Sequence, residues 1–315
     1  MQKVSIREAF GKTLVKIGAQ NPDVVVLVAD VSSSLMTDYF GEKFPDRFFN
    51  LGIQEAGMVD VAVGFALAGM IPFTNTFAGL YLRTVEQIRT CVAYARTNVK
   101  IIGGYCGLSD FKDGPTHHSI VDIAVMRALP NMVVISPADA TEVEKILPLV
   151  AEYDGPCYVR LSRADLPVVF DDNHQVEIGK GIVIKEGEDV ALIGTGVMTW
   201  RCLEAAKILS GDGIDCTVIN IHTLKPLDES LIIETAEKTG AIVTAEEHSI
   251  IGGLGSAVAE VLANNCPVVV ERVGIADRFT ETSLDFESLL DHYGMSVQDI
   301  VGAAKRAVHR KQKVK

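Results

Sequence analysis

The chain of 315 residues has no apolar run long enough to cross a membrane. Its longest such run, Val61 to Phe73, is shorter than the ~20 residues that a transmembrane helix needs. The N-terminus alternates charged and apolar residues and contains no signal-peptide core. We therefore expect a cytoplasmic protein that does not act at a membrane.

Positive charge is in short supply. The chain has 29 Lys and Arg against 41 Asp and Glu, so its formal net charge is −12. A field of that sign repels nucleic acid, which is excluded as a partner. The basic tail from Lys305 to Lys315 is interpreted as a solvated terminus.

The six cysteines form no CxxC pair and show no metal-binding spacing. Zinc-finger and thiol-redox motifs are therefore not indicated, and we expect reduced, buried thiols and no metal held by this chain. Hydrophobic residues make up 48% of the sequence and charged residues 22%, a composition that favours a folded globular protein over disorder.

Short β-branched runs alternate with longer segments of helical periodicity along the whole chain. This pattern is typical of parallel sheets covered by helices, and the length suits two such units. We predict two three-layer α/β domains, each with a mostly parallel sheet covered by helices on both faces. The expected ranges are 1–167 and 187–315, with a linker at 168–186.

Polar residues gather just after the predicted strands of the first domain. The strands expected there are Val24–Val28, Phe48–Asn50, Pro72–Thr74, Lys100–Gly103, Met132–Ile135 and Cys157–Arg160. The segments that follow include Asp30–Ser34, Gly52–Glu55, Thr74–Phe77, Tyr105–His118 and Ser162–Arg163. Because ligands bind at the carboxyl ends of parallel strands, we predict a ligand site where these segments meet.

Glu55 begins a predicted helix whose residues are small and apolar on nearly every face. Such a helix must be buried, and desolvation of a carboxyl in its first turn favours the protonated form. The alternative is a glutamate in partial solvent that complements the helix dipole. A second long helix is expected over Leu80–Ala95.

The loop Asp110 to His118 is too rich in titratable groups to be only a turn. His117 and His118 are adjacent, so at most one of them is expected to face a given site. Either histidine is a candidate for proton transfer near neutral pH.

Three segments in this order, Gly52-Ile53-Gln54-Glu55, Thr74-Asn75-Thr76-Phe77 and Asp113-Gly114-Pro115-Thr116-His117, resemble the pyrimidine-binding domain of transketolases. Arg7, Ala29-Asp30 and Leu161-Ser162-Arg163 also fit that domain. The remainder, Leu166 to Lys315, resembles the C-terminal domain of the same family, so the resemblance covers essentially the whole chain.

The resemblance implies thiamine diphosphate as the cofactor. Glu55 would hydrogen-bond the N1′ atom of its aminopyrimidine and so promote loss of the thiazolium C2 proton. Phe77 would stack on the pyrimidine ring. The residues expected against the cofactor besides these are Asp30, Val31 and Leu80, the last standing where many relatives have a second aromatic residue.

The resemblance also implies transfer of a two-carbon ketol unit from a ketose phosphate to an aldose phosphate. His117 would move protons at sugar hydroxyls, and Asp113 would recognise the hydroxyl next to the carbonyl. Arg7, Ser34 and Arg163 would grip the sugar phosphate. Tyr105 stands where many relatives have a phosphate-binding histidine, and a phenol carries no positive charge at pH 7.

The diphosphate-binding half of a transketolase is missing from this sequence. Gly211-Asp212-Gly213 matches part of the metal motif, but no Asn follows between Ile221 and Ala263, so we interpret it as a turn. The resemblance therefore implies a separate N-terminal subunit that binds the diphosphate and holds Mg²⁺ or another divalent metal. The expected assembly is α2β2.

Three alternatives remain open at this point. The β-subunit of a 2-oxoacid dehydrogenase has a glutamate like Glu55 but lacks the Asp113–His117 segment. Deoxyxylulose-phosphate synthase has a similar segment but is normally one long chain. A non-catalytic structural or regulatory paralogue would keep the fold without the chemistry.

Overall fold

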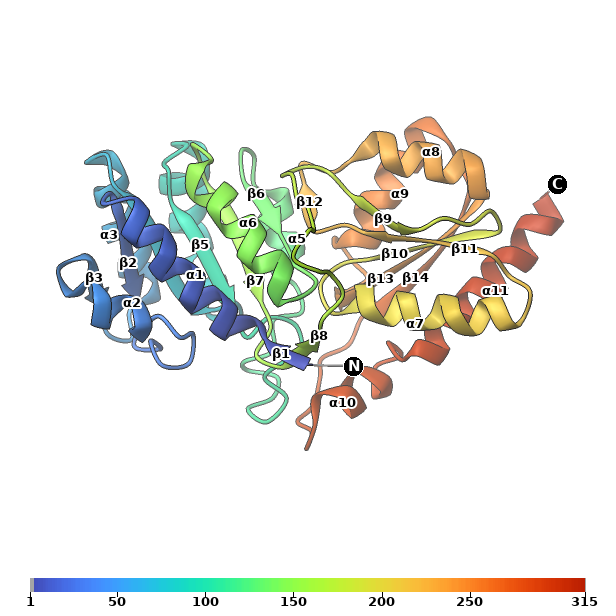
Figure 1. Ribbon diagram of the computed structural model, residues 1–315, viewed down its shortest axis with the longest axis horizontal. Coiled ribbons are helices and arrows are strands. Elements are labelled where there is room, and N and C mark those ends of the chain that lie inside the picture. Colours follow the sequence, from blue (N-terminus) through green and yellow to red (C-terminus); the bar gives the residue numbers. More distant parts are fainter. Residues whose placement is uncertain (1–2, 315) are drawn as a thin grey trace.

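The structure, a computed structural model, describes residues 3–314, and in it two sheets lie side by side (Figure 1). The N-terminal sheet occupies the left of the view and the C-terminal sheet the right. No helix in the described part of the chain is long and apolar enough to cross a membrane.

The first sheet has seven strands in the order β12-β6-β7-β5-β4-β2-β3. Neighbours from β6 to β3 pair in parallel, while β12 pairs antiparallel with β6. The strands are β2 (Val24–Val28), β3 (Phe48–Asn50), β4 (Ile71–Phe77), β5 (Lys100–Gly104), β6 (Val133–Ile135), β7 (Cys157–Leu161) and β12 (Thr223–Lys225).

Helices cover both faces of this sheet because its strands are apolar on both sides. In β2, Val24, Val26 and Val28 pack with α1 (Ile6–Gln20), α2 (Asp38–Lys43) and α6 (Ala140–Glu152). Val25 and Leu27 point the other way, toward α3 (Glu55–Leu67), η3 (Ile88–Tyr94) and α5 (Asp122–Ala128). A short 3₁₀ helix, η1 (Pro45–Arg47), precedes β3.

The second sheet has five strands in the order β14-β13-β10-β11-β9, with only the edge strand β9 antiparallel. They are β9 (Ile182–Lys185), β10 (Val190–Gly194), β11 (Cys216–Asn220), β13 (Ala241–Ser249) and β14 (Val269–Ile275). One face packs against α7 (Met198–Gly211), α10 (Phe286–His292) and α11 (Val297–Val314), the other against α8 (Glu229–Thr239) and α9 (Leu254–Asn265). The predicted fold class, two mostly parallel sheets covered by helices, is confirmed.

Some elements differ from the sequence prediction. The single helix expected over Leu80–Ala95 is wrong: the segment is divided into η2 (Leu80–Thr84), α4 (Val85–Gln87) and the π-helix η3. Thr84 contributes to the break, because its hydroxyl donates to the Tyr81 carbonyl and competes with regular helix bonding. The range 168–186, expected as a linker, contains strand β9.

Two strand pairings link segments that lie far apart in the sequence. The second domain supplies β12 to the edge of the first sheet. Within the first domain, β1 (Lys3–Ser5) pairs antiparallel with β8 (Asp165–Pro167). Neither pairing is visible in local periodicity, because each depends on a distant partner.

A buried ion pair lies at the junction of the two domains. Arg160 in β7 donates to both carboxylate oxygens of Asp122, at 2.6 and 3.1 Å, and the hydroxyl of Tyr158 donates to the same carboxylate. Burial alone would raise the pKa of Asp122, but Arg160 holds it below its ordinary value. Arg160 also donates to the Glu247 carbonyl in β13, so the pair ties the two sheets together.

Replacing Arg160 with Met should destabilise the chain by about 3–5 kcal/mol, because it leaves the Asp122 carboxylate buried without its charged partner. Arg89→Met is the control, since Arg89 forms an exposed pair with Glu86 and should cost at most about 1 kcal/mol. Urea unfolding at fixed protein concentration measures both changes. Equal effects for the two variants would contradict the role given to the buried pair.

Candidate active site

The register of the first sheet brings the carboxyl ends of its parallel strands to one edge. Val28 pairs with both Asn50 and Asn75, and Gly104 pairs with both Phe77 and Leu161. The loops that follow β2, β3, β4, β5 and β7 therefore leave the sheet together. The sequence analysis placed its polar segments at this edge, but Thr74–Phe77, expected to follow a strand, is the second half of β4 and only Phe77 reaches the end of the strand.

Glu55 is the first residue of α3 and is only 3% exposed. Arg83 Nη1 lies 3.6 Å from Glu55 Oε2, which is beyond hydrogen-bond length. Leu80, at the start of η2, is half-buried on the segment that packs against α3. The partly solvated cap considered as an alternative for Glu55 does not match this burial.

Asp30 and Val31 follow β2 directly. Asp30 is exposed, adopts a left-handed backbone with φ of 60°, and exchanges hydrogen bonds of 3.2 Å with Asn50 at the end of β3. Val31 is half-buried. The Asp30–Asn50 pair thus fixes the first loop of the edge to its neighbour.

Phe77 and Tyr105 form an aromatic stack at the ends of β4 and β5. Their ring centroids are 4.1 Å apart and the planes are inclined by 21°. His117 lies 6.0 Å from the Phe77 ring, tilted by 59°. Three residues chosen from separate sequence segments therefore meet at one place.

Two guanidinium groups flank Tyr105. Arg7 Nη1 donates to the Ser34 carbonyl at 2.7 Å and to the Tyr105 hydroxyl at 3.1 Å. The Arg163 guanidinium lies 5.5 Å from the centre of the Tyr105 ring, within the range of a cation–π contact. Arg7, Ser34, Tyr105 and Arg163 thus form one cluster that carries positive charge.

The two adjacent histidines point to different surroundings. His117 is half-buried near Phe77, and its Nδ1 lies 3.0 Å from the Thr116 hydroxyl. His118 is buried, 2.7 Å from the Thr280 hydroxyl of the second domain and 3.1 Å from the Asp110 carbonyl. Of the pair, His117 is the one that lies with the aromatic stack.

Asp110 is a candidate that sequence reasoning missed as a site residue. It is fully buried, and Arg163 Nε lies 3.7 Å from its carboxylate. Neither carboxylate oxygen has a hydrogen-bond partner among residues 3–314. Burial, with the exposed Asp113 alongside, raises the pKa of Asp110 to about 6. Its position three residues before Asp113 was the available signal.

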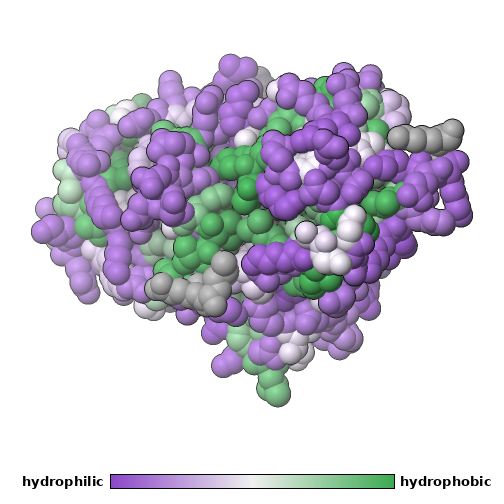
Figure 2. Space-filling model, turned by 45° about the vertical axis from the view of Figure 1, so that its right-hand side comes forward, coloured by the Kyte–Doolittle hydropathy of each residue, from purple (hydrophilic) through white to green (hydrophobic). Residues whose placement is uncertain are grey.

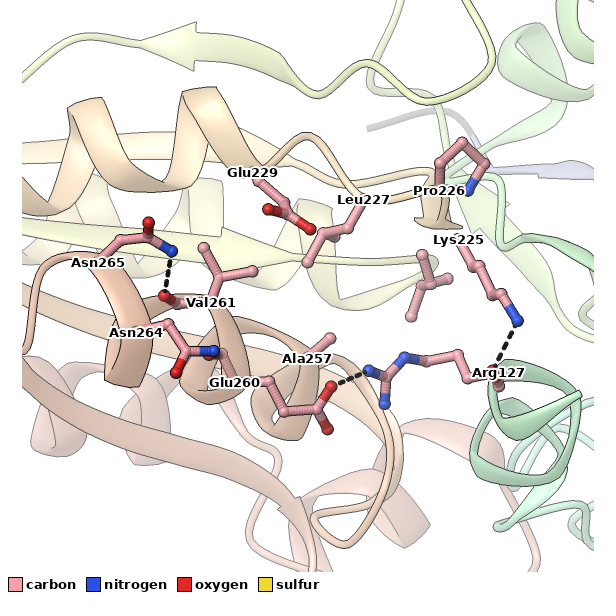
Figure 3. A pocket seen from close by; sticks show the side chains of 11 residues that line it. Arg127, Lys225, Pro226, Leu227, Glu229, Ala257, Glu260, Val261, Asn264 and Asn265 are labelled. Carbon is pink, nitrogen blue, oxygen red and sulfur yellow. Dashed lines mark hydrogen bonds and ion pairs between the residues drawn. The ribbon is translucent and has the colours of Figure 1, made fainter. Parts of the chain in front are cut away.

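A separate pocket of about 400 Å³ lies beside β12, the edge strand of the first sheet opposite to β3 (Figure 3). None of the predicted site residues lines it. Arg127 enters it from α5 and donates to Glu260 of α9, while Lys225 donates to the Arg127 carbonyl. These charged groups are hydrogen-bonded to one another across the two domains, so we interpret the pocket as part of the domain junction. No cluster of three or more metal-binding side chains occurs among residues 3–314.

Two known protein families match this chain, one over each domain. Residues 2–169 match the transketolase pyrimidine-binding domain, and residues 179–300 match the transketolase C-terminal domain. The chain belongs to the transketolase family. The match with the pyrimidine-binding domain implies use of thiamine diphosphate.

Several similar proteins are single sections or subunits of transketolases. A 6-deoxy-6-sulfo-D-fructose transketolase subunit of Clostridium sp. (strain MSTE9) is 39% identical, over 97% of this chain and 95% of its own length. A putative transketolase C-terminal section of Methanocaldococcus jannaschii is 40% identical, over 98% and 96%. A solved split-gene transketolase, described as an inactive beta4 tetramer, is 45% identical with a TM-score of 0.91, over 98% and 100%.

These matches make the chain the C-terminal section of a split transketolase. The sequence prediction of that family is confirmed. The roles of the individual site residues remain predictions.

The pKa of Asp110 leads to a test of its burial. A carboxyl whose pKa is raised on folding stabilises the fold below its unfolded pKa, and that contribution is lost as pH rises through about 6. Arg163 and His117 oppose the rise, while Asp113 adds to it. Asp110→Asn should therefore be no more stable than the parent near pH 4 but more stable at pH 7.5, by up to about 3 kcal/mol.

Melting temperatures of the two proteins across this pH range measure the difference. The exposed Asp172→Asn is the control and should follow the parent at every pH. A constant offset between Asp110→Asn and the parent would contradict the raised pKa.

Proposed function

We propose that this chain is the subunit of a two-chain transketolase that holds the pyrimidine half of thiamine diphosphate and the sugar. It acts in the transfer of a two-carbon ketol unit from an anionic ketose to an anionic aldose. The observation that carries the proposal is that the segment with buried Glu55 leaves the sheet at the same edge as the Phe77–Tyr105 stack, which Arg7 and Arg163 contact.

The residues at this edge fit the pyrimidine ring of the cofactor. Glu55 is desolvated, and its neighbour Arg83 does not reach hydrogen-bond distance, which leaves the carboxyl able to bond N1′. Phe77 offers an aromatic face, with Val31 and Leu80 as apolar contacts. When bound, thiamine diphosphate supplies the nucleophilic carbon that attacks the ketose carbonyl.

The positive cluster fits the anionic end of a sugar. Arg7 and Arg163 present guanidinium groups, which match phosphate and other oxyanions. Tyr105 adds a hydroxyl donor between them in place of a charged histidine. His117 would hold or release a proton at a sugar hydroxyl, and Asp113 would accept a hydrogen bond from the hydroxyl beside the carbonyl.

Two anionic groups are candidates for the end of the sugar that this cluster binds: a phosphate and a sulfonate. A phosphate is expected from the sequence resemblance, but one similar subunit is named for a sulfo-sugar, whose sulfonate is also an oxyanion. Arg7 and Arg163 suit either group. We place phosphate first, and the donor assay below includes both.

A partner chain is expected on the surface beside Glu55. Ile53, Leu67 and Tyr94, on and around α3 and η3, are 78%, 77% and 83% exposed. Figure 2, turned to bring the C-terminal side of the molecule forward, shows a mostly hydrophilic face with hydrophobic residues near its centre and at a projection below. Large exposed apolar groups mark interaction surfaces when they cluster. We propose that an N-terminal subunit, which holds the diphosphate and its metal, covers α3 in an α2β2 assembly.

The rival activities predict different substrates. The Asp113–His117 segment beside the Phe77–Tyr105 stack favours a sugar enzyme over a 2-oxoacid dehydrogenase subunit. A synthase of the deoxyxylulose-phosphate type would require pyruvate as the donor. A non-catalytic paralogue would need no buried Glu55.

The chain alone should show no ketol transfer, and mixing it with its N-terminal partner, thiamine diphosphate and Mg²⁺ should produce it. The assay offers a ketose phosphate, the matching sulfonate sugar and pyruvate as separate donors. Transfer from a ketose confirms the proposal. Turnover of pyruvate alone, or full activity without the partner, would refute it.

Replacing Glu55 with Gln in the assembled enzyme should lower kcat by about 10²-fold or more, because an amide cannot exchange the proton that the carboxyl shares with the pyrimidine. Glu144→Gln, an exposed change on α6, is the control and should leave kcat unaltered. Unchanged turnover in the Glu55 variant would favour the non-catalytic reading.

A further inference from the structure

The second domain holds the loop that carries His117. Glu247 Oε1, in β13, accepts a hydrogen bond of 2.6 Å from the Leu108 amide. The backbone amide of Ser249, two residues later, donates to the Ile120 carbonyl at 2.8 Å, at the other end of the loop. The backbone amide of Ser283 donates to the Phe111 carbonyl, also at 2.8 Å. The loop from β5 to α5 is thus held at both ends by residues of the other domain.

The carboxyl group of Glu247 lies against the backbone of Gly107, where a side chain on that residue would collide with it. It is 4% exposed, and a Cβ added at Gly107 would overlap its carboxyl group. Gly107 also has a positive φ of 61°, which L side chains rarely adopt. The glycine therefore serves two needs at once: it permits the turn, and it leaves room for the carboxyl group of Glu247.

This turn connects directly to the substrate cluster. Tyr105, two residues before Gly107, has a φ of 57° and stacks on Phe77. Ser109, two residues after it, donates to the Cys106 carbonyl at 2.6 Å and accepts from the Arg163 amide at 3.0 Å. Whatever fixes residues 105–109 therefore fixes both the phenol and the backbone of Arg163.

We propose that Glu247 is a positioning residue for the sugar site. Its carboxyl oxygen fixes the turn of residues 105–109 from the second domain, so that Tyr105 and Arg163 face the anionic end of the sugar. It acts through these residues and does not touch the sugar. The kinetic part of this inference rests on the proposed function, whereas the structural part does not.

The hydrogen bond needs an acceptor at Glu247 but does not need a charge. Burial raises the pKa of Glu247 to about 8; Arg160 and Arg201 oppose the rise and Asp122 adds to it. A protonated carboxyl still accepts through its carbonyl oxygen, and so does the amide of Gln. Glu247→Gln should therefore keep the turn in place, whereas Glu247→Met, similar in size but without an oxygen, should release it.

Glu246 provides a matched control. It is the preceding residue of β13 and fully buried, and it also accepts backbone hydrogen bonds, at 2.7 Å from Leu254 and 2.8 Å from Gly255. Those amides lie at the start of α9, not in the loop. Glu246→Met therefore removes the same kind of interaction from the same strand without changing the turn.

The first experiment is hydrogen–deuterium exchange on the isolated chain. Glu247→Met should speed exchange at the Leu108 amide about tenfold, the equivalent of one lost hydrogen bond, while Glu247→Gln stays near the parent. Glu246→Met should speed exchange at the start of α9 and leave residues 105–119 unchanged. Unaltered exchange at Leu108 in Glu247→Met, or equal loosening of the loop by Glu246→Met, would overturn the proposal.

The second experiment uses the enzyme assembled with its partner. Glu247→Met should raise KM for the anionic sugar about tenfold, with a smaller change in kcat and unchanged half-saturation by thiamine diphosphate, and Glu247→Gln should restore KM. A parallel loss of kcat, sugar affinity and cofactor affinity would mean a merely structural role and would contradict positioning. If the parent assembly is itself inactive, the proposed function fails, and the exchange result still decides the turn.

Discussion

The parallel register of the first sheet is the constraint on which the candidate site depends. Parallel strands end at the same edge, so residues that are far apart in the sequence must leave the sheet together. The pairings of Val28 with Asn50 and Asn75, and of Gly104 with Phe77 and Leu161, set that edge. The segments that carry Glu55, Phe77, Tyr105 and Arg163 therefore leave the sheet at the same edge.

The second domain contacts the same edge of the sheet, and a separate chain is proposed to cover it as well. Glu55 is buried by its own chain, whereas large apolar residues on and around α3 and η3 are exposed. On the opposite side, the second domain reaches across with Glu247, Ser249 and Ser283 to hold the substrate loop. The C-terminal domain thus contributes to the site by fixing backbone, while a separate chain is proposed to complete the pocket for the cofactor.

Local patterns and family motifs predicted much of this site. Glu55, Phe77 and His117 fall in segments whose order resembles transketolases, and the parallel strands follow from their β-branched runs. Glu247 was not predicted, because its role depends on a contact with Leu108 that is 139 residues away in sequence. Strand β12 was not predicted for the same reason, since its partner β6 belongs to the other domain.

Asp110 and the segment Leu80–Ala95 show two other limits of sequence reasoning. A buried carboxylate without hydrogen-bond partners in the described part of the chain is a property of packing, so Asp110 looked like one polar loop residue among several. The segment Leu80–Ala95 has helical periodicity, but side-chain bonds such as that from Thr84 to the Tyr81 carbonyl break it into shorter turns. Tertiary packing decides the first case, whereas in the second a local side-chain bond competes with the regular helix.

A structure of the chain assembled with its N-terminal partner and thiamine diphosphate tests the account most directly. The proposed arrangement requires the pyrimidine N1′ within about 3 Å of the Glu55 carboxyl, with the ring against Phe77 and the diphosphate on the partner chain. A cofactor held entirely by the partner, with Glu55 still covered by its own chain and no pyrimidine beside it, would contradict the account.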